Sequence, residues 1–304
     1  MSATPAEDAV RDRPSLTRRI IMDCKEIRNI ITKFIHDEVG DSGRSNTVIG
    51  VSGGIDSSVV LNLAVHALGT KRITAVLMPT RTKDVSNVDY RDSVNLVDSY
   101  GVEYTTIPVD YYLLYPEIKH TKPLTNSGIV DIDTRRYNNM VSRMRMSILY
   151  DQAILRNAIV LGTTNKTEFI LGYFTKYGDG GVDIEPIADI YKTEVFQLAK
   201  CIGTPENIIN KPPSAGFGFT DEEELDMKLS DIDQILWWLI EEGYDAVSLE
   251  RELEKLTGIR DRSVLEKVLD RMSNNYHKTH MPKVCKIGNV DLRPNFSNGK
   301  RGRG

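Results

Sequence analysis

Long apolar runs and closely spaced cysteines are both missing from this sequence. A helix that spans a bilayer needs ~20 mostly apolar residues, and no segment offers such a run, so we expect no membrane partner. Residues 1–13 are polar, carry charges of both signs and have no apolar core, which argues against a secretory signal. The three cysteines, Cys24, Cys201 and Cys285, show neither a metal-binding nor a disulfide spacing. They predict unpaired packing groups in a reducing, cytoplasmic environment.

An excess of positive charge is also missing. Lys and Arg total 39 against 43 Asp and Glu, a formal net charge of -4. This balance argues against a nucleic-acid partner, because such proteins carry an excess of basic residues. An anionic substrate would have to be held by a few locally placed cations. With 40% apolar and 27% charged residues, the composition is that of a globular protein. We expect one domain over residues 1–304, with disordered ends at 1–13 and 288–304.

Helix and strand patterns alternate through the first half of the chain. Short apolar, β-branched segments predict strands at 46–52, 73–79, 104–109 and 158–163. Helical patterns before and between them cover 15–38, 57–68, 85–100 and 138–156. The alternation predicts an α/β fold, in which helices flank both faces of a parallel sheet and ligands bind beyond the carboxyl ends of the strands. The C-terminal half is predicted to be mainly helical, at 189–202, 221–227, 230–242, 245–257 and 262–277.

Two apolar features of these helices leave their packing partner open. The helix over 15–38 has a single apolar stripe, which could pack on the domain's own sheet or on a second copy of the chain. Trp237 and Trp238 lie beside the apolar face of the helix over 230–242. They are predicted to be core or interface residues and not a binding platform.

A turn with two adjacent glycines, an acid and three serines joins the first strand, which includes Gly50, to its helix. It reads Ile49-Gly50-Val51-Ser52-Gly53-Gly54-Ile55-Asp56-Ser57-Ser58. Glycines let backbone N–H groups approach a ligand, and a helix N-terminus adds partial positive charge, so the turn suits phosphate. Two glycines alone would fit an ordinary connection, but the acid and serines at this spacing favour nucleotide binding. No Gly-Lys-[Ser/Thr] follows, so the turn is not a Walker A loop.

A second signature follows the last predicted strand. Residues 162–168 read Gly-Thr-Thr-Asn-Lys-Thr-Glu, and residues 172–183 read Gly-Tyr-Phe-Thr-Lys-Tyr-Gly-Asp-Gly-Gly-Val-Asp. Such a concentration of glycines and acids cannot form a regular element. It can fold its backbone around a ligand and hold Lys176 and Asp183 at the rim.

The first turn resembles the pyrophosphate loop of the N-type ATP pyrophosphatases. With the second signature and the segments 139–146, 211–215 and 220–225, the chain is similar to the NAD synthetase family from about residue 15 to residue 283. The resemblance implies an adenine nucleotide alpha-hydrolase-like, Rossmann-like fold and a homodimer. It implies a ligase that adenylates the nicotinate carboxylate of deamido-NAD with ATP, releases pyrophosphate, and lets ammonia displace AMP. Glutamine-dependent relatives carry a further amidase domain that has no counterpart here, so ammonia is the expected donor.

The resemblance also implies roles in binding ATP and metal. The matching ATP-binding positions are Gly50, Val51, Ser52, Gly53, Gly54, Ile55, Asp56, Ser57, Thr163, Lys192 and Ser214. Asp56 and Glu168 match ligands of Mg²⁺, which takes one or two carboxylates besides phosphate. Each residue has an ordinary alternative: Asp56 could cap its helix, Asn165 and Glu168 could form a capping box, and Lys192 could be an exposed lysine.

For deamido-NAD, the matching residues are Arg143, Lys176, Asp183, His277 and Lys278. Asp56, Glu168, Lys192 and Asp183 are the implied catalytic residues, with Asp183 orienting ammonia. The C-terminal match is weakest, because Thr279 replaces a family arginine. Three rivals stay open: another pyrophosphatase-loop enzyme, a regulator that has lost activity, and a synthetase for a different pyridine carboxylate.

Overall fold

The computed structural model describes residues 24–80, 87–109, 132–214, 219–280 and 285. The expected disordered ends and most of the loop over 115–133 lie outside these residues. The elements, in chain order, are α2 (Cys24–Asp41), β1 (Asn46–Gly50), α3 (Ile55–Leu68), η2 (Thr70–Arg72), β2 (Ile73–Leu77), α4 (Asn87–Tyr100), β3 (Glu103–Thr106), α6 (Ile132–Leu155), β4 (Ala158–Leu161), α7 (Lys166–Leu171), α8 (Lys192–Cys201), α9 (Glu206–Ile209), α10 (Asp221–Leu225), α11 (Leu229–Ile240), α12 (Ala246–Thr257), α13 (Ser263–Asn275) and η4 (Tyr276–Lys278).

The four described strands form one parallel sheet in the order β3-β2-β1-β4. Gly50 pairs with Val76 on one side of β1, and Ile49 pairs with Leu161 on the other. The chain moves outward from β1 through β2 to β3 and then returns across the sheet to β4. The loops after β1 and β4 therefore leave the sheet in different directions, which opens a crevice between them. The predicted α/β fold with a parallel sheet is confirmed.

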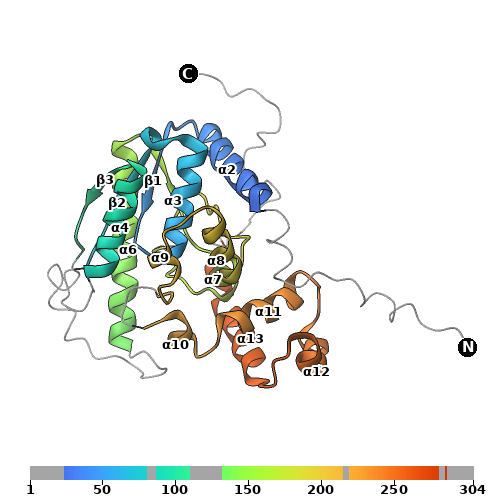
Figure 1. The fold of residues 1–304 in the computed structure, drawn as a ribbon. Coiled ribbons are helices and arrows are strands. Elements are labelled where there is room, and N and C mark those ends of the chain that lie inside the picture. Colours follow the sequence, from blue (N-terminus) through green and yellow to red (C-terminus); the bar gives the residue numbers. More distant parts are fainter. Residues whose placement is uncertain (1–23, 81–86, 110–131, 215–218, 281–284, 286–304) are drawn as a thin grey trace, which may run out of the picture.

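Helices cover both faces of the sheet (Figure 1). Ile49 of β1 packs into the core shared with α2, α3, α4 and α8, whereas its neighbour Val48 packs against α6 on the other face. This alternation follows from the two-residue repeat of a strand. Right-handed crossovers put α3 and α4 on one face and α6 on the opposite one. Ile31 and Ile35 of α2 lie in this main core, so the stripe of α2 packs on the domain's own core.

The C-terminal helices form a second core. Leu236 of α11, Leu249 of α12 and Val268 of α13 are buried together, and Leu171 of α7 joins them. Trp237 and Trp238 are partly buried against this cluster, which confirms their prediction as packing residues. In Figure 1 this helical part lies to one side of the sheet, with α7 and α8 between the two. No helix in the described part of the chain is long and apolar enough to span a membrane.

One sequence-based expectation is wrong. Cys24 and Cys201 form a disulfide that joins the start of α2 to the last residue of α8, with their Cα atoms 6.6 Å apart. The two cysteines are 177 residues apart in the chain, so no local spacing could indicate the pair. Only the packing of α2 and α8 around the same core brings them together. Cys285 is free and exposed.

Candidate active site

The predicted phosphate loop, residues 50–57, joins β1 to α3 at the carboxyl edge of the sheet. Its serines bind the loop itself. The Ser52 hydroxyl oxygen lies 3.1 Å from that of Ser57 and accepts the Gly54 N–H at 3.2 Å. The Ser57 hydroxyl also lies 3.1 Å from the Gly54 carbonyl. These bonds hold the turn in shape directly before the helix N-terminus, where an anion would bind.

Gly53 is the position in this loop where only glycine fits. Its φ is +80°, and an added Cβ would lie 2.3 Å from the backbone oxygen of Asp89. The Lys211 ammonium fixes the same place, because it donates to the Gly53 carbonyl at 3.2 Å and to the Asp89 carboxylate at 2.7 Å. The loop is thus held from α4 and from the segment after α9.

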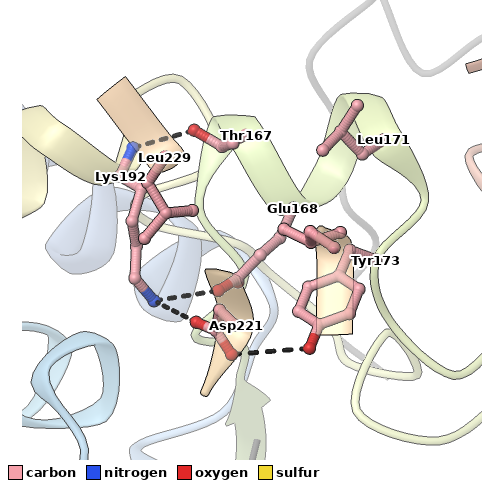
Figure 2. Close-up of a pocket in the computed structure, with 8 residues that line it drawn as sticks. Thr167, Glu168, Leu171, Tyr173, Lys192, Asp221 and Leu229 are labelled. Carbon is pink, nitrogen blue, oxygen red and sulfur yellow. Dashed lines mark hydrogen bonds and ion pairs between the residues drawn. The ribbon is translucent and has the colours of Figure 1, made fainter. Parts of the chain in front are cut away.

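Lys192 stands at the centre of the carboxylate cluster, the name used here for Asp56, Glu168 and Asp221 around its ammonium. It is the first residue of α8 and is 2% exposed. Its Nζ lies 2.7 Å from Asp56 Oδ2, 3.1 Å from Glu168 Oε1 and 3.5 Å from Asp221 Oδ2. Figure 2 shows the ammonium pointing toward Glu168 and Asp221. The alternative of an exposed lysine is wrong, and Lys192 joins Asp56, which follows β1, to Glu168, which follows β4.

The cluster contains three carboxylates and one ammonium. Burial by itself would lower the pKa of Lys192, but the negative charges of Asp56, Glu168 and Asp221 outweigh it and hold that pKa well above its ordinary value. Burial raises the pKa of Glu168 to about 8; Lys192 opposes the shift, and the other two acids add to it. Burial also raises the pKa of Asp221. Lys192 is therefore charged at neutral pH, and the surplus of acids suits a further cation.

The capping alternatives for the two predicted metal ligands have different outcomes. The N-cap of α3 is Gly54, without a side-chain cap, and the Asp56 carboxylate instead accepts from Asn165 Nδ2 at 3.0 Å and from Lys192. Glu168 does form the capping box with Asn165. Its second oxygen nevertheless binds Lys192, so one side chain caps α7 and belongs to the cluster.

Asp221 is the member of the cluster that sequence reasoning missed. It begins α10, its side chain is 5% exposed, and the Tyr173 hydroxyl lies 3.4 Å from its Oδ1. The same hydroxyl donates to Glu224 at 2.7 Å. The signals in the sequence were the resemblance of the segment 220–225 to the family and its run of four acids over 221–224. Which of four adjacent acids faces inward depends on how α10 packs, and the run itself does not specify this.

A small cavity lies behind the cluster (Figure 2). Its polar side includes Glu168, Lys192 and Asp221, and its apolar side includes Leu171, Leu225 and Leu229. The leucines belong to the second core. The helical half therefore supplies an apolar wall that keeps water from one side of the charges. Because charges interact more strongly where water is excluded, this wall strengthens the contacts of Lys192.

A second set of charged side chains consists of Lys176, within the glycine-rich loop over 172–181, and of Arg143 and Lys278, which donate to carbonyls of that loop. We call these three residues the cationic loop group. The Lys278 ammonium donates to two carbonyls of that loop at 2.6 and 2.9 Å. Lys176 Nζ donates to the His277 carbonyl at 2.7 Å, and Arg143 Nε donates to the Lys176 carbonyl at 3.3 Å. The structure thus brings together four of the five residues predicted to bind deamido-NAD.

Asp183, the fifth, has other partners. Its Oδ2 accepts the Val160 N–H of β4 at 2.7 Å, and its Oδ1 accepts the Tyr150 hydroxyl of α6 at 3.1 Å. Burial, with the charge of Asp183, raises the pKa of Tyr150 to about 12. Asp183 therefore ties the loop to the sheet, and its role toward ammonia stays a prediction.

The remaining predicted ATP contacts differ in what they can offer. Val51 and Ile55 bury their side chains in the core, so they can present only backbone groups. Thr163 lies just beyond β4 and is partly buried. The Ser214 hydroxyl donates to the Phe219 carbonyl at 2.7 Å. Within the described residues, neither hydroxyl belongs to the carboxylate cluster.

Comparison with known proteins gives a family match over most of the chain. The family model described as NAD synthase matches residues 27–282. A protein named NH(3)-dependent NAD(+) synthetase from Methanosarcina mazei is 41% identical over 273 residues, which cover 88% of this chain and 100% of the relative. Its counterpart from Archaeoglobus fulgidus is 39% identical over 269 residues, covering 88% of this chain and 98% of the relative.

Solved structures of similar proteins agree with this family match. An NH3-dependent NAD synthetase from Campylobacter jejuni has a TM-score of 0.69 and 32% identity, and the match covers 87% of this chain and 100% of the other. An NMN synthetase from Francisella tularensis has a TM-score of 0.70 and 29% identity, with 90% and 99% covered.

Proposed function

The chain belongs to the NAD synthase family and has its ammonia-dependent activity, the conversion of deamido-NAD to NAD; we propose that this reaction takes place at the carboxylate cluster and the loop over 50–57. The observation that carries the proposal is the place of Lys192. It is buried among three carboxylates, at the point where the loops after β1 and β4 diverge. Ligands of open parallel sheets bind at such a point.

In this proposal, the ATP phosphates lie along the loop over 50–57 and the N-terminus of α3. A carboxylate is a poor electrophile, so the nicotinate carboxylate first attacks the α-phosphorus and pyrophosphate leaves. Ammonia then attacks the carbonyl carbon of the adenylate, loses a proton, and AMP departs. Lys192 stabilises the negative charge that develops on the phosphoryl oxygens, because it is charged and fixed before the substrate arrives.

Asp56 and Glu168 are the residues proposed to hold Mg²⁺. The donor set fits: these are hard oxygen ligands beside an anion-binding loop, and the acids of the cluster outnumber its single ammonium. Among the described residues, no group of three or more acidic, His or Cys side chains is arranged as a complete metal site. Such an arrangement is not required, since Mg²⁺ uses one or two carboxylates together with substrate phosphates. When bound, the ion would neutralise charge on the departing pyrophosphate.

Deamido-NAD is proposed to bind near the cationic loop group. Arg143 can present a planar fork to the dinucleotide pyrophosphate, while Lys176, His277 and Lys278 shape the adjoining surface. Asp183 is exposed at the edge of this region, and we propose that it faces the nicotinamide end, where ammonia enters.

We also propose a homodimer. Ile154 and Leu155, at the end of α6, are 75% and 73% exposed, and Ile30 of α2 is 60% exposed. Exposed apolar side chains on these two helices suit a subunit contact. The mass in solution, measured by light scattering, tests this proposal. A cytoplasmic location stays a prediction.

The activity assay supplies the purified chain with ATP, Mg²⁺ and deamido-NAD, together with either ammonium or glutamine, and follows NAD and AMP. We expect equal amounts of NAD and AMP with ammonium and almost none with glutamine. A parallel reaction replaces deamido-NAD by nicotinate mononucleotide, because one similar structure is named an NMN synthetase. Faster turnover of the mononucleotide would change the proposed substrate. AMP release in the absence of both deamido-NAD and nicotinate mononucleotide, or no turnover at all, would contradict the proposed function.

A further inference from the structure

Asp233 is a buried acid outside the carboxylate cluster. It lies on α11 in the helical half and is 1% exposed. Aspartate is almost never fully buried unless its oxygens are paired. Both are: Oδ1 accepts the Thr167 hydroxyl of α7, and Oδ2 accepts the Thr193 backbone N–H of α8 at 2.8 Å. One carboxylate thus binds the two helices that carry Glu168 and Lys192.

The Thr167 hydroxyl continues this connection. Its oxygen accepts the backbone N–H of Lys192 at 2.9 Å, as Figure 2 shows, while its hydrogen is donated to Asp233. The first N–H groups of a helix have no partner within the helix. In α8 the first two of them, on Lys192 and Thr193, are satisfied from α7 and α11.

This arrangement fixes the distance between two side chains of the cluster. Thr167 precedes Glu168 in α7, and Lys192 precedes Thr193 in α8. Holding Thr167 and Thr193 on one carboxylate therefore sets how far apart α7 and α8 begin. That spacing places Lys192 Nζ 3.1 Å from Glu168 Oε1, although Asp233 touches neither side-chain end.

We propose that Asp233 is a positioning residue for the reaction: through Thr167 and Thr193 it holds the start of α8 so that the Lys192 ammonium is aligned with Glu168. The inference rests on the proposed roles of Lys192 and Glu168. It assigns the helical half a part in catalysis besides the apolar wall, since α11 belongs to that half.

The test compares Asp233→Asn, Thr167→Val, Thr167→Ser and the double variant Thr167→Val/Asp233→Asn. Asparagine keeps the volume and can still accept from Thr193, but its amide presents hydrogens to the Thr167 hydroxyl. Valine keeps the shape of Thr167 but removes the hydroxyl that joins Asp233 to the Lys192 N–H, whereas serine keeps that hydroxyl. Asp231→Asn, two residues away on the same helix, is the matched control. Each variant is assayed for kcat, for KM of ATP and deamido-NAD, and for Tm.

We expect Asp233→Asn and Thr167→Val to lower kcat roughly 10–100-fold, as changes that misplace a catalytic group do, with little change in either KM. The double variant should be no slower than the slower single variant, because both changes break the same connection. Thr167→Ser and Asp231→Asn should keep near-normal kcat.

Unchanged kcat in folded Asp233→Asn, or additive losses in the double variant, would overturn the proposal. If Asp233→Asn does not fold, the two Thr167 variants decide. Equal kcat in Thr167→Val and Thr167→Ser overturns the proposal, and a low kcat in Thr167→Val alone supports it. Failure of the proposed function can be distinguished from failure of the positioning role. If the proposed role of Lys192 is wrong, Lys192→Met retains activity. If Lys192→Met is inactive while Asp233→Asn is fully active, only the positioning role fails.

Discussion

The carboxylate cluster and the cationic loop group hold their charges in opposite ways. In the cluster, the Lys192 ammonium meets three carboxylates and is 3% exposed at its side chain. In the cationic loop group, Lys278 and Lys176 donate instead to backbone carbonyls. Loss of one member of the cluster leaves buried charges unpaired, whereas loss of Lys278 leaves two backbone carbonyls, which carry no net charge, without their donor. The cluster should therefore govern the chemical step, and the loop group should govern substrate binding.

Lys192→Met gives the sharpest test of the cluster. It removes the central charge, so we expect kcat to fall about 10³-fold or more, at the upper end of what a single stabilising donor contributes. The free energy of unfolding should also fall, because buried acids lose their partner. Lys200→Met, on the exposed end of α8, is the control. Stopped-flow or coupled assays give kcat, and near-normal turnover in Lys192→Met would remove the distinction between the two regions.

Asp56→Asn and Glu168→Gln test whether the acids hold a metal ion or only pair with Lys192. We expect each to lower kcat about 100-fold and to weaken binding of Mg²⁺, since such an ion contributes several kcal/mol to catalysis. Titration with Mg²⁺ in the presence of ATP measures the binding. Glu222→Gln on α10 serves as the matched control. If both variants bind Mg²⁺ as tightly as the wild type does, the two acids do not hold the ion and only pair with Lys192.

Lys278→Met tests whether the cationic loop group governs substrate binding. The variant frees two carbonyls of the glycine-rich loop, so KM for deamido-NAD should rise roughly tenfold, equivalent to about 1.4 kcal/mol of lost binding, with kcat largely kept. Lys267→Met on α13, whose ammonium pairs with Asp226 near the surface, controls for charge. A fall in kcat without a change in KM would show that the loop group also acts on the chemical step, so the two regions would not have separate roles.

Glu185→Gln is expected to have the smallest effect and concerns a partly buried acid outside both groups. Its Oε2 accepts the Thr164 N–H at 3.1 Å, and burial raises its pKa to about 8. The folded state then keeps a proton that the unfolded state loses above about pH 4.3. Wild-type stability should fall as pH rises from there toward 8. The Tm of the variant should be close to wild type at pH 5 and above it at pH 8. The same Tm difference at both pH values would contradict a raised pKa.

Much of the fold follows from local patterns. The alternation of apolar segments and helix patterns predicts the parallel sheet, and all four predicted strands overlap the observed ones. The capping box at Asn165 and the serine bonds of the turn over 52–57 are also local, because they join residues a few positions apart. Helix limits are less well predicted: α6 begins at Ile132, six residues before the predicted start, since that extension carries no clear apolar repeat.

The sequence by itself determined which residues form the turns and which side chains bring charge and hydroxyl groups to them. Only the tertiary structure decided that Lys192 is buried between Asp56 and Glu168, that Asp221 and not its neighbours completes the cluster, and that Cys24 meets Cys201. These contacts join residues that are far apart in the chain. Their formation depends on how helices pack across the sheet, and that packing is decided by the whole core together.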